Sequence, residues 1–321
     1  MLESYTPSFS ADVVEALKAG GAILVGQTNM DEFGMGSATT NSAMGPSINP
    51  LPHLHPPSSS TSSPPNLTPG GSSGGSASSV AWRSSFASIG SDTGGSVRLP
   101  AAHTNTTGFK PTYGSISRFG LIPYASSLDT VGLITPTPSD AKLLFDMPPP
   151  VLRCWSSTAS LLSSLGSPVD VLPPSSLSPE TVRSSLAAYY VIACAEASSN
   201  LSKYDGVRYG SRLRDGSVGF EEEYEGTRGA FLGEEVRRRV ACGDAVLERE
   251  GSHYLKANIL RNKLRDDLNK ALELFDFILI PTQTSPPFDL DDPEDKIDQN
   301  SVRVANILNI SRPAKPPSRS R

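Results

Sequence analysis

Two short stretches rich in glycine and serine, PGGSSGGS at residues 69–76 and GSDTGGSVR at residues 90–98, decide how this sequence is interpreted. We call them the first and the second serine loop. Glycine at this density lets the backbone turn tightly and lets several N–H groups converge on one point. Converging N–H groups are what a developing oxyanion requires. Because both loops also carry serines, the sequence indicates a site for nucleophilic chemistry.

A reactive serine in these loops needs a neighbouring base that accepts its proton. Histidine is the usual base, and the chain has four, His53, His55, His103 and His253, none of which lies inside either loop. The other known arrangement passes the proton through a second serine to a neutral lysine. Two serine loops in tandem fit that relay better than a triad based on histidine.

The serine loops belong to a longer set of motifs. Residues 69–98, GFKPTYG at 108–114 and SRFGLI at 117–122 together resemble the amidase signature family. Further motifs resemble one branch of that family, the A subunits of glutamyl-tRNA(Gln) amidotransferases: NMDEFGMGS at 29–37, YASSLD at 124–129, and the blocks at 190–201, 203–210 and 231–239. The resemblance covers most of residues 1–145 and 188–290.

This resemblance implies an α/β protein with the amidase signature fold, a mixed β-sheet core flanked by helices. It implies a single amidase domain over residues 1–290. Within this domain, residues 46–69 form an insert rich in proline and serine, and residues 147–187 diverge from the family. Residues 291–321 also diverge, and we expect them to form a poorly ordered tail.

Local patterns predict a few elements independently of the family. Ser10 can cap a helix over residues 10–19, which Gly20 and Gly21 end. Residues 22–25 have the pattern of a buried strand. A long charged helix is predicted over residues 254–274, and a buried strand over residues 277–280.

The resemblance also assigns roles in the site. Ser96 stands where the family has its acyl-forming nucleophile, and Ser72 stands where it has the bridging serine that follows a cis peptide bond. These two serines are 24 residues apart, as in the family. The backbone N–H groups of Thr93, Gly94, Gly95 and Ser96 would form the oxyanion hole.

Two residues are assigned to substrate binding by the same resemblance, Arg261 and Ser73. Arg261 matches the position where the glutamine-specific branch holds the carboxylate of its substrate, and a solvated arginine on a helix stays open as the alternative. Ser73 also occupies the centre of a G-x-S-x-G pattern, which leaves open a hydrolase elbow with Ser73 as nucleophile. Asp92 and Arg98 are expected to brace the second serine loop.

The relay also needs a base, and the sequence has no lysine at the position where the family has one. In the family, a lysine in a Lys-Asp-Asn-like motif precedes the NMDEF segment. Here Lys18 is the only lysine before the first serine loop, and it matches no such motif. We therefore expect the catalytic lysine to be absent from these residues. Loss of one member of a catalytic relay costs on the order of 10⁴ to 10⁶ in turnover, so the chain is expected to be nearly inactive.

Composition narrows the possible partners. The formal net charge of −5 argues against a broad basic surface for nucleic acid. The three cysteines have no ligand-like spacing, so we predict reduced thiols and no metal site. No apolar run approaches the roughly 20 residues that a membrane span needs. The N-terminus has neither a signal peptide nor an Arg-rich transit pattern, and a mitochondrial location is expected only from the eukaryotic branch of the family.

The resemblance implies that glutamine is the substrate and that ammonia passes to a partner that amidates Glu-tRNA(Gln). The implied partners are the other amidotransferase subunits, one of B type and a small one of C or F type, with the tRNA reached through the complex. The chain itself would bind no cofactor, because the partner would hold the ATP and Mg²⁺ that the complex needs. Two alternatives stay open: a catalytically incomplete relic or scaffold, and a general amidase for small amides.

Overall fold

The computed structural model describes residues 1–3, 5–56, 63–146, 177, 179–213, 219–248, 252–275, 278, 282 and 287–291. The elements of this part, in chain order, are α1 (Asp12–Ala19), η1 (Glu32–Gly34), α2 (Leu51–Leu54), α3 (Gly74–Ala81), β1 (Ser88–Asp92), α4 (Arg98–His103), β2 (Thr107–Phe109), β3 (Thr130–Thr135), α5 (Pro138–Asp146), α7 (Pro179–Leu201), α8 (Phe220–Phe231), α9 (Glu234–Glu248) and α10 (Ser252–Leu274).

The sheet of the described part has three strands in the order β1-β3-β2. Both pairings are antiparallel, and β1 meets β3 in a register that sets Asp92 opposite Thr130. All six residues of the central strand β3 are buried. The predicted α/β class is therefore observed, but the parallel component expected of a mixed sheet is not seen among the described strands.

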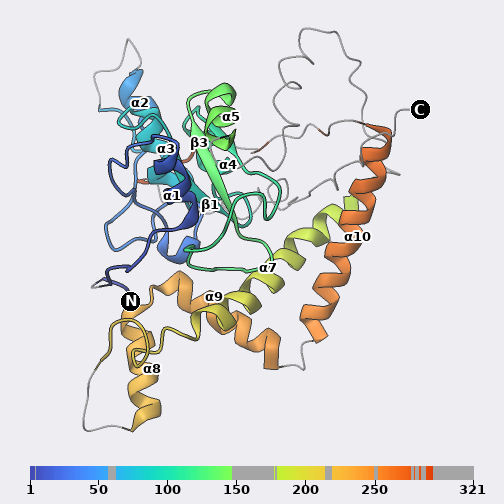
Figure 1. The fold of residues 1–321 in the computed structure, drawn as a ribbon. Helices are drawn as coiled ribbons and strands as arrows, with labels where there is room; N and C mark the ends of the chain where they lie inside the picture. The colour runs from blue at the N-terminus through green and yellow to red at the C-terminus, as the bar shows by residue number, and fades with distance from the viewer. Residues whose placement is uncertain are drawn as a thin grey trace.

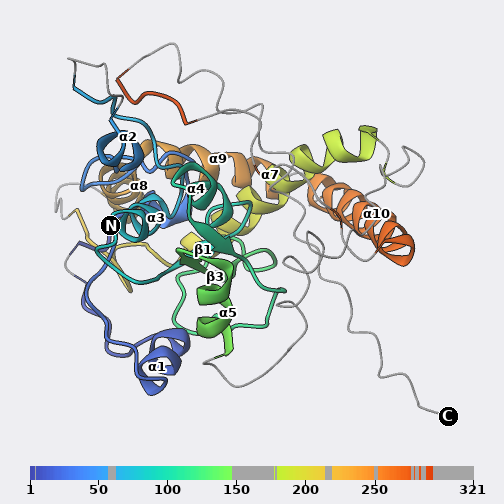
Figure 2. The same ribbon diagram turned by 90° about the horizontal axis from the view of Figure 1, so that it is seen from above.

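Helices cover both faces of this sheet. Along β3, alternate side chains point to opposite faces. Ile134 packs against α3 and α4 through Ala77, Val80, Val97 and Ala101, whereas Val131 packs on the other face with Val13 of α1 and Phe145 of α5. Figure 2 shows this layering, with α3 and α4 above the strands and α5 below them. The second serine loop therefore runs from the end of β1 into α4, directly over a packed core.

A second group of helices lies beside the sheet layers. In Figure 1, α7 runs under the sheet. Helices α9 and α10 both pack against α7. Pro179 stands at the start of α7, where a proline is tolerated in a helix. The largest apolar cluster joins α7 and α9 to the segment around Tyr124 and Leu128. This cluster connects the helices to the loop that leads into β3.

Two of the predicted helices are observed with small shifts, as α1 and α10. The predicted buried strand at residues 22–25 is wrong. This segment has no strand assignment, and Ile23, Leu24 and Val25 are 86%, 63% and 75% exposed. An extended segment is buried as a strand only where a neighbouring strand satisfies its backbone, and none of the described strands lies beside this one. The strand predicted at 277–280 lies largely outside the described residues.

The insert at residues 46–69 is ordered at its ends. Asn49 and Thr68 are buried, and α2 forms within the insert. Leu67 forms a bridge with Asp289, and the N–H of Thr68 donates to the carbonyl of Phe288 at 2.9 Å. The end of the insert is thus fixed by residues 288–290 just before the first serine loop begins. Residues 57–62, 147–176 and 292–321 lie outside the described part, so the predictions for the divergent segment and the tail concern mainly undescribed residues.

Candidate active site

The first serine loop is packed against the segment that follows η1. The peptide bond between Gly71 and Ser72 is cis, as the resemblance implies. Thr39 Oγ1 donates to the carbonyl of Gly70 at 2.8 Å and accepts the N–H of Gly74 at 3.0 Å. A Cβ added at Gly71 would lie 2.4 Å from Oδ2 of the buried Asp31. Only glycine therefore fits at position 71, and one threonine fixes both ends of the turn.

The two serine side chains of this loop are buried. Ser72 is 0% exposed and Ser73 is 2% exposed, and neither hydroxyl has a hydrogen-bond partner in the described part of the chain. A buried hydroxyl without a partner costs about 1–3 kcal/mol. Such a group in a functional protein marks a place where another group is expected to bind. The backbone N–H of Ser73 donates to the carbonyl of Ser96 at 3.1 Å and so joins the two serine loops directly.

The second serine loop is organised by one buried carboxylate. Asp92, at the end of β1, accepts the N–H of Gly95 at 2.8 Å and the N–H of Val97 at 3.2 Å. Arg98 donates to Asp92 through Nε at 3.0 Å and through its terminal nitrogen at 2.8 Å. Burial opposes the charge of Asp92, but Arg98 outweighs burial and holds the pKa of this carboxyl below its ordinary value. The expectation that Asp92 and Arg98 brace the loop agrees with this geometry.

Several backbone N–H groups of the second serine loop could donate hydrogen bonds to an oxyanion. Gly95 has a φ of 118°, which favours glycine. Its N–H is already engaged by Asp92. Of the four N–H groups that the resemblance assigns to the oxyanion hole, those of Thr93, Gly94 and Ser96 are therefore the better candidates. A Cβ at Gly94 would lie 2.6 Å from the ring of Tyr189, so this turn is also packed against α7.

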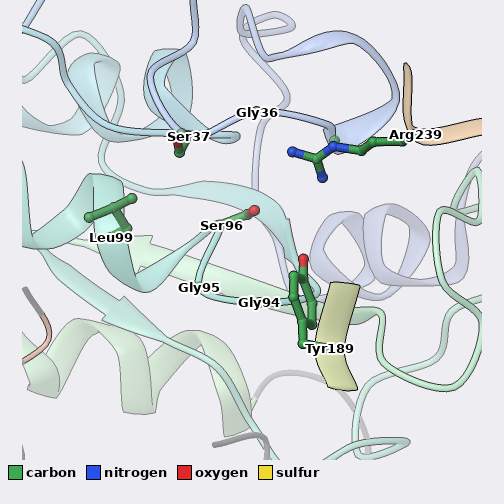
Figure 3. A pocket seen from close by; sticks show the side chains of 10 residues that line it. Gly36, Ser37, Gly94, Gly95, Ser96, Leu99, Tyr189 and Arg239 are labelled. Atoms are coloured by element: carbon green, nitrogen blue, oxygen red, sulfur yellow. The ribbon is translucent and has the colours of Figure 1, made fainter. Parts of the chain in front are cut away.

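A pocket opens at the second serine loop. It is lined by four residues of the segment around η1 and the first serine loop, four of the second serine loop and α4, and one each from α7 and α9: Gly34, Gly36, Ser37, Gly71, Gly94, Gly95, Ser96, Leu99, Tyr189 and Arg239. Figure 3 shows the hydroxyls of Ser96 and Tyr189 and the guanidinium of Arg239 turned toward the same space. The arrangement brings a serine hydroxyl and a cation into one pocket.

Arg239 is a site residue that the sequence analysis missed. It lies on the buried stripe of α9 with Val236, Val240 and Gly243, and it is only 5% exposed. Glu235 accepts its Nε–H at 2.7 Å, and the hydroxyl of Tyr124 accepts another N–H at 2.7 Å. Burial opposes the charge, but contact with Tyr124, Tyr189 and Glu235 raises the pKa of Arg239 above its ordinary value. The guanidinium therefore stays charged beside Ser96.

Arg261, predicted to bind substrate, lies on α10 and is directed at a different segment. Its guanidinium donates to Oγ of Ser127 at 3.0 Å and to the carbonyl of Ser127 at 2.9 Å. It is not one of the residues that line the pocket described above. Ser73 likewise does not line that pocket, and a Cβ added at Gly90 of β1 would lie 2.6 Å from its Oγ. The roles predicted for Arg261 and Ser73 stay predictions.

Within the described residues, no group of three or more histidine, cysteine, aspartate or glutamate side chains is placed to hold a metal ion. No described helix combines the length and the apolar character that crossing a membrane requires.

Comparison with known proteins decides the family. A sequence profile of the family described as Amidase matches residues 1–148 and 142–316. The chain belongs to the amidase family. The A subunit of the glutamyl-tRNA(Gln) amidotransferase of Natronomonas pharaonis is 37% identical over 98% of this chain and 83% of its own length. The protein of the same name from Desulforapulum autotrophicum is 38% identical over 97% of this chain and 70% of its own length. The mitochondrial A subunit from Fusarium vanettenii is 38% identical over 99% of this chain and 69% of its own length.

Solved structures of amidase proteins agree with the fold. The crystal structure of the A subunit of glutamyl-tRNA(Gln) amidotransferase from Thermotoga maritima is 32% identical, and the match covers 96% of this chain and 69% of that chain with a TM-score of 0.64. A crystal structure described as an amidase matches with a TM-score of 0.68 at 26% identity, over 93% of this chain and 68% of that chain. The pocket at Ser96 is thus the candidate active site of an amidase-family protein.

Proposed function

We propose that this chain is the glutaminase, or A, subunit of a glutamyl-tRNA(Gln) amidotransferase. Relatives with that name, 37% and 38% identical over nearly the whole chain, support this assignment. The observation that carries it is the pocket in which the Ser96 hydroxyl and the Arg239 guanidinium face each other. A serine nucleophile beside a buried cation suits a carboxamide substrate that also carries a carboxylate, and glutamine is such a substrate.

In the proposed reaction, Oγ of Ser96 attacks the carboxamide carbon of glutamine. The N–H groups of Thr93, Gly94 and Ser96 stabilise the resulting oxyanion. The proton of Ser96 passes through Ser72 to a base and then to the departing nitrogen, which leaves as ammonia. Water then hydrolyses the acyl ester on Ser96, which releases glutamate and restores the serine. The ammonia passes to the partner subunits, which amidate activated Glu-tRNA(Gln).

Substrate recognition is proposed for Arg239. Glu235 and Tyr124 hold its guanidinium from one side, and the other side is turned toward the pocket. A planar guanidinium binds a carboxylate through two parallel hydrogen bonds. This position favours Arg239 over Arg261, whose guanidinium is engaged with Ser127. The same arginine favours glutamine over small amides without a carboxylate.

The relay needs a base beyond Ser72. The Ser72 hydroxyl has no hydrogen-bond partner among the described residues, lysines included. We therefore propose that the 321-residue chain binds glutamine but hydrolyses it very slowly, because no described residue is placed to accept the proton of Ser72. This is the condition under which the chain would act as a catalytically incomplete scaffold that keeps the loop architecture. ATP and Mg²⁺ are proposed to bind to the partner subunits.

Glutamine binding tests the proposal without requiring turnover. Calorimetry would compare L-glutamine with 4-aminobutanamide, which is glutamine without its α-carboxylate. The wild type is expected to bind glutamine and to discriminate against 4-aminobutanamide. Arg239→Ala is expected to lose that discrimination, whereas Arg261→Ala, the matched control on α10, is expected to keep it. Equal affinity of the wild type for both ligands would instead support a general small-amide amidase.

A mitochondrial location is proposed on one relative, the mitochondrial A subunit of Fusarium vanettenii. Fractionation of cells that produce the protein with a C-terminal tag tests this proposal. Recovery in the mitochondrial matrix fraction is expected, and recovery only in the cytosolic fraction would contradict it.

A further inference from the structure

Asp129 is a buried carboxylate to which no role has been assigned so far. It is 2% exposed and directly precedes β3. The antiparallel register pairs Asp92 with Thr130, so one step further along the two strands Thr93 comes opposite Asp129. The sheet itself therefore brings Asp129 to the first residue of the turn that carries Ser96.

Asp129 makes one contact with the second serine loop. Its Oδ1 accepts the hydroxyl of Thr93 at 2.6 Å, and both groups are buried. Thr93 lies between Asp92 and Gly94 in the turn. Asp92 accepts the N–H groups of Gly95 and Val97, and Gly94 lines the pocket. The Thr93 hydroxyl therefore fixes the part of the turn that Asp92 does not reach.

The other contacts of Asp129 are with the segment on the opposite side. Its Oδ2 accepts the N–H of Tyr124 at 2.8 Å, and the N–H of Ala125 lies 3.1 Å and 3.0 Å from its two oxygens. All of these partners are donors, so the ionised carboxylate is the form that fits. Burial raises the pKa of Asp129, while the bonds to Thr93, Ala125 and Tyr124 and the charge of Arg118 oppose that rise.

Tyr124 extends this chain of contacts to the other wall of the pocket. Its phenol is 3% exposed and accepts an N–H of Arg239 at 2.7 Å. It also shares a hydrogen bond with Tyr189, the aromatic residue that lines the pocket. A displacement of the Tyr124 backbone would therefore move the phenol that holds Arg239 in place.

We propose that Asp129 is a positioning residue that fixes both halves of the site, the oxyanion turn through Thr93 and the substrate-binding Arg239 through Tyr124. This inference rests on the proposed function, because it assumes that the pocket binds glutamine and stabilises an oxyanion. Asp129 touches neither substrate nor the reacting atoms. It acts by setting the distance between the group that binds the carboxylate and the group that reacts with the carboxamide.

The test uses three ligands on the 321-residue chain and needs no turnover. Glutamine reports on Arg239. The boronate 3-aminopropylboronic acid forms a tetrahedral adduct with a serine hydroxyl and reports on the oxyanion turn. The compound 2-amino-4-boronobutanoic acid, which is glutamine with a boronic acid in place of the carboxamide, reports on both. Calorimetry gives the affinities, and circular dichroism melting gives the stability of each variant.

The single variants are expected to separate the effect on the oxyanion turn from the effect on Arg239. Tyr124→Phe is expected to weaken glutamine binding about 5- to 10-fold, because Arg239 loses one hydrogen bond. The affinity for 3-aminopropylboronic acid is expected to stay unchanged. Thr93→Val is expected to weaken both boronates by a similar factor and to leave glutamine unchanged. Asp129→Asn is expected to weaken all three ligands, while Asp146→Asn, an exposed carboxylate at the end of α5, changes none of them.

The outcomes distinguish this inference from the proposed function. A wild type that binds neither glutamine nor the boronates overturns the proposed function and the inference with it. A wild type that binds all three, together with an Asp129→Asn variant that melts earlier but binds them equally well below its melting point, overturns the inference alone. If Asp129→Asn does not fold, the inference is overturned when Tyr124→Phe and Thr93→Val weaken the same ligands to the same extent.

Discussion

The two serine loops of this protein are held in opposite ways. The second loop is organised from within by Asp92, which takes N–H groups of the loop itself and is neutralised by Arg98. The first loop is held from outside by Thr39 and Asp31, and both of its buried hydroxyls lack a partner in the described structure. Among the described residues, the loop that carries Ser96 thus has its supporting contacts, whereas the Ser72 hydroxyl, proposed to pass on the proton, has no acceptor.

The largest expected effect is on the formation of a boronate adduct, for which the serines of the two loops should differ. Ser96→Ala should abolish the tetrahedral adduct with 2-amino-4-boronobutanoic acid, because Ser96 is the serine of the second serine loop that lines the pocket. Ser72→Ala should retain it, because forming a boronate adduct does not need the relay. Boron-11 NMR detects the change from trigonal to tetrahedral boron. An adduct that survives in Ser96→Ala and disappears in Ser72→Ala would reverse the assignment of the two loops.

The next effect concerns the carboxylate that organises the second loop. Asp92 is fully buried and bonded to Arg98, whose side chain is 21% exposed, so Asp92→Asn leaves a largely buried cation without its counter-charge and should destabilise the protein by about 3 kcal/mol. Asp146→Asn breaks an exposed pair with Lys142 and should cost no more than about 1 kcal/mol. Urea unfolding gives both values. Similar losses in the two variants would show that Asp92 does not organise the loop.

A smaller effect is expected from overpacking the first loop. Gly71→Ala would place a Cβ 2.4 Å from Oδ2 of Asp31 and 2.7 Å from the N of Ala38. Overpacking of this kind costs about 1–3 kcal/mol. Gly229→Ala, in an open position on α8, should instead stabilise the protein by about 0.5–1 kcal/mol. Urea midpoints that shift in the same direction for both variants would argue against the tight contact between Gly71 and Asp31.

The smallest effect is a pH dependence near the first loop. His103 is 6% exposed, and burial lowers its pKa to about 4. Below its unfolded pKa of about 6.5 the unfolded chain binds more protons than the folded chain, so stability falls as the pH drops from 6.5 toward 4. His103→Phe should therefore remove about 2 kcal/mol of the stability lost between pH 7 and pH 5.

The control for this prediction is His253→Phe, because His253 is exposed on α10. Unfolding in urea at the two pH values should show the same loss for this variant as for the wild type. An unchanged pH dependence in His103→Phe would mean that the imidazole is not buried as the structure has it.

The parts of the molecule that depend on local chemistry could be predicted from the sequence. The glycines of the serine loops are required by backbone turns and close contacts, so they are visible in the sequence as motifs. Helices α1 and α10 were predicted because apolar spacing and the glycine that ends α1 are also local signals. The predicted cap Ser10 was wrong, because Ala11 stands at the N-cap and makes no side-chain cap hydrogen bond. The strand at residues 22–25 was predicted wrongly, because burial depends on a neighbour that no local pattern reveals.

Arg239 shows what local reasoning could not supply. The approach of α9 to the Ser96 turn depends on its packing against α7, and this packing brings Arg239 and Tyr189 to one pocket. The signal available in the sequence was an arginine on an apolar helical stripe, between Val236 and Val240. A buried arginine is rare unless it is paired, so that position deserved more weight than the exposed pattern around Arg261.

Glutamine hydrolysis by the purified 321-residue chain, measured as ammonia release beside a calorimetric binding experiment, tests the central claim most directly. We predict that the chain binds glutamine and releases ammonia no faster than its Ser96→Ala variant, because no described residue accepts a hydrogen bond from the Ser72 hydroxyl. This corresponds to turnover on the order of 10⁴ to 10⁶ below that of a complete relay. Ordinary turnover of glutamine that is abolished by Ser96→Ala would contradict the account.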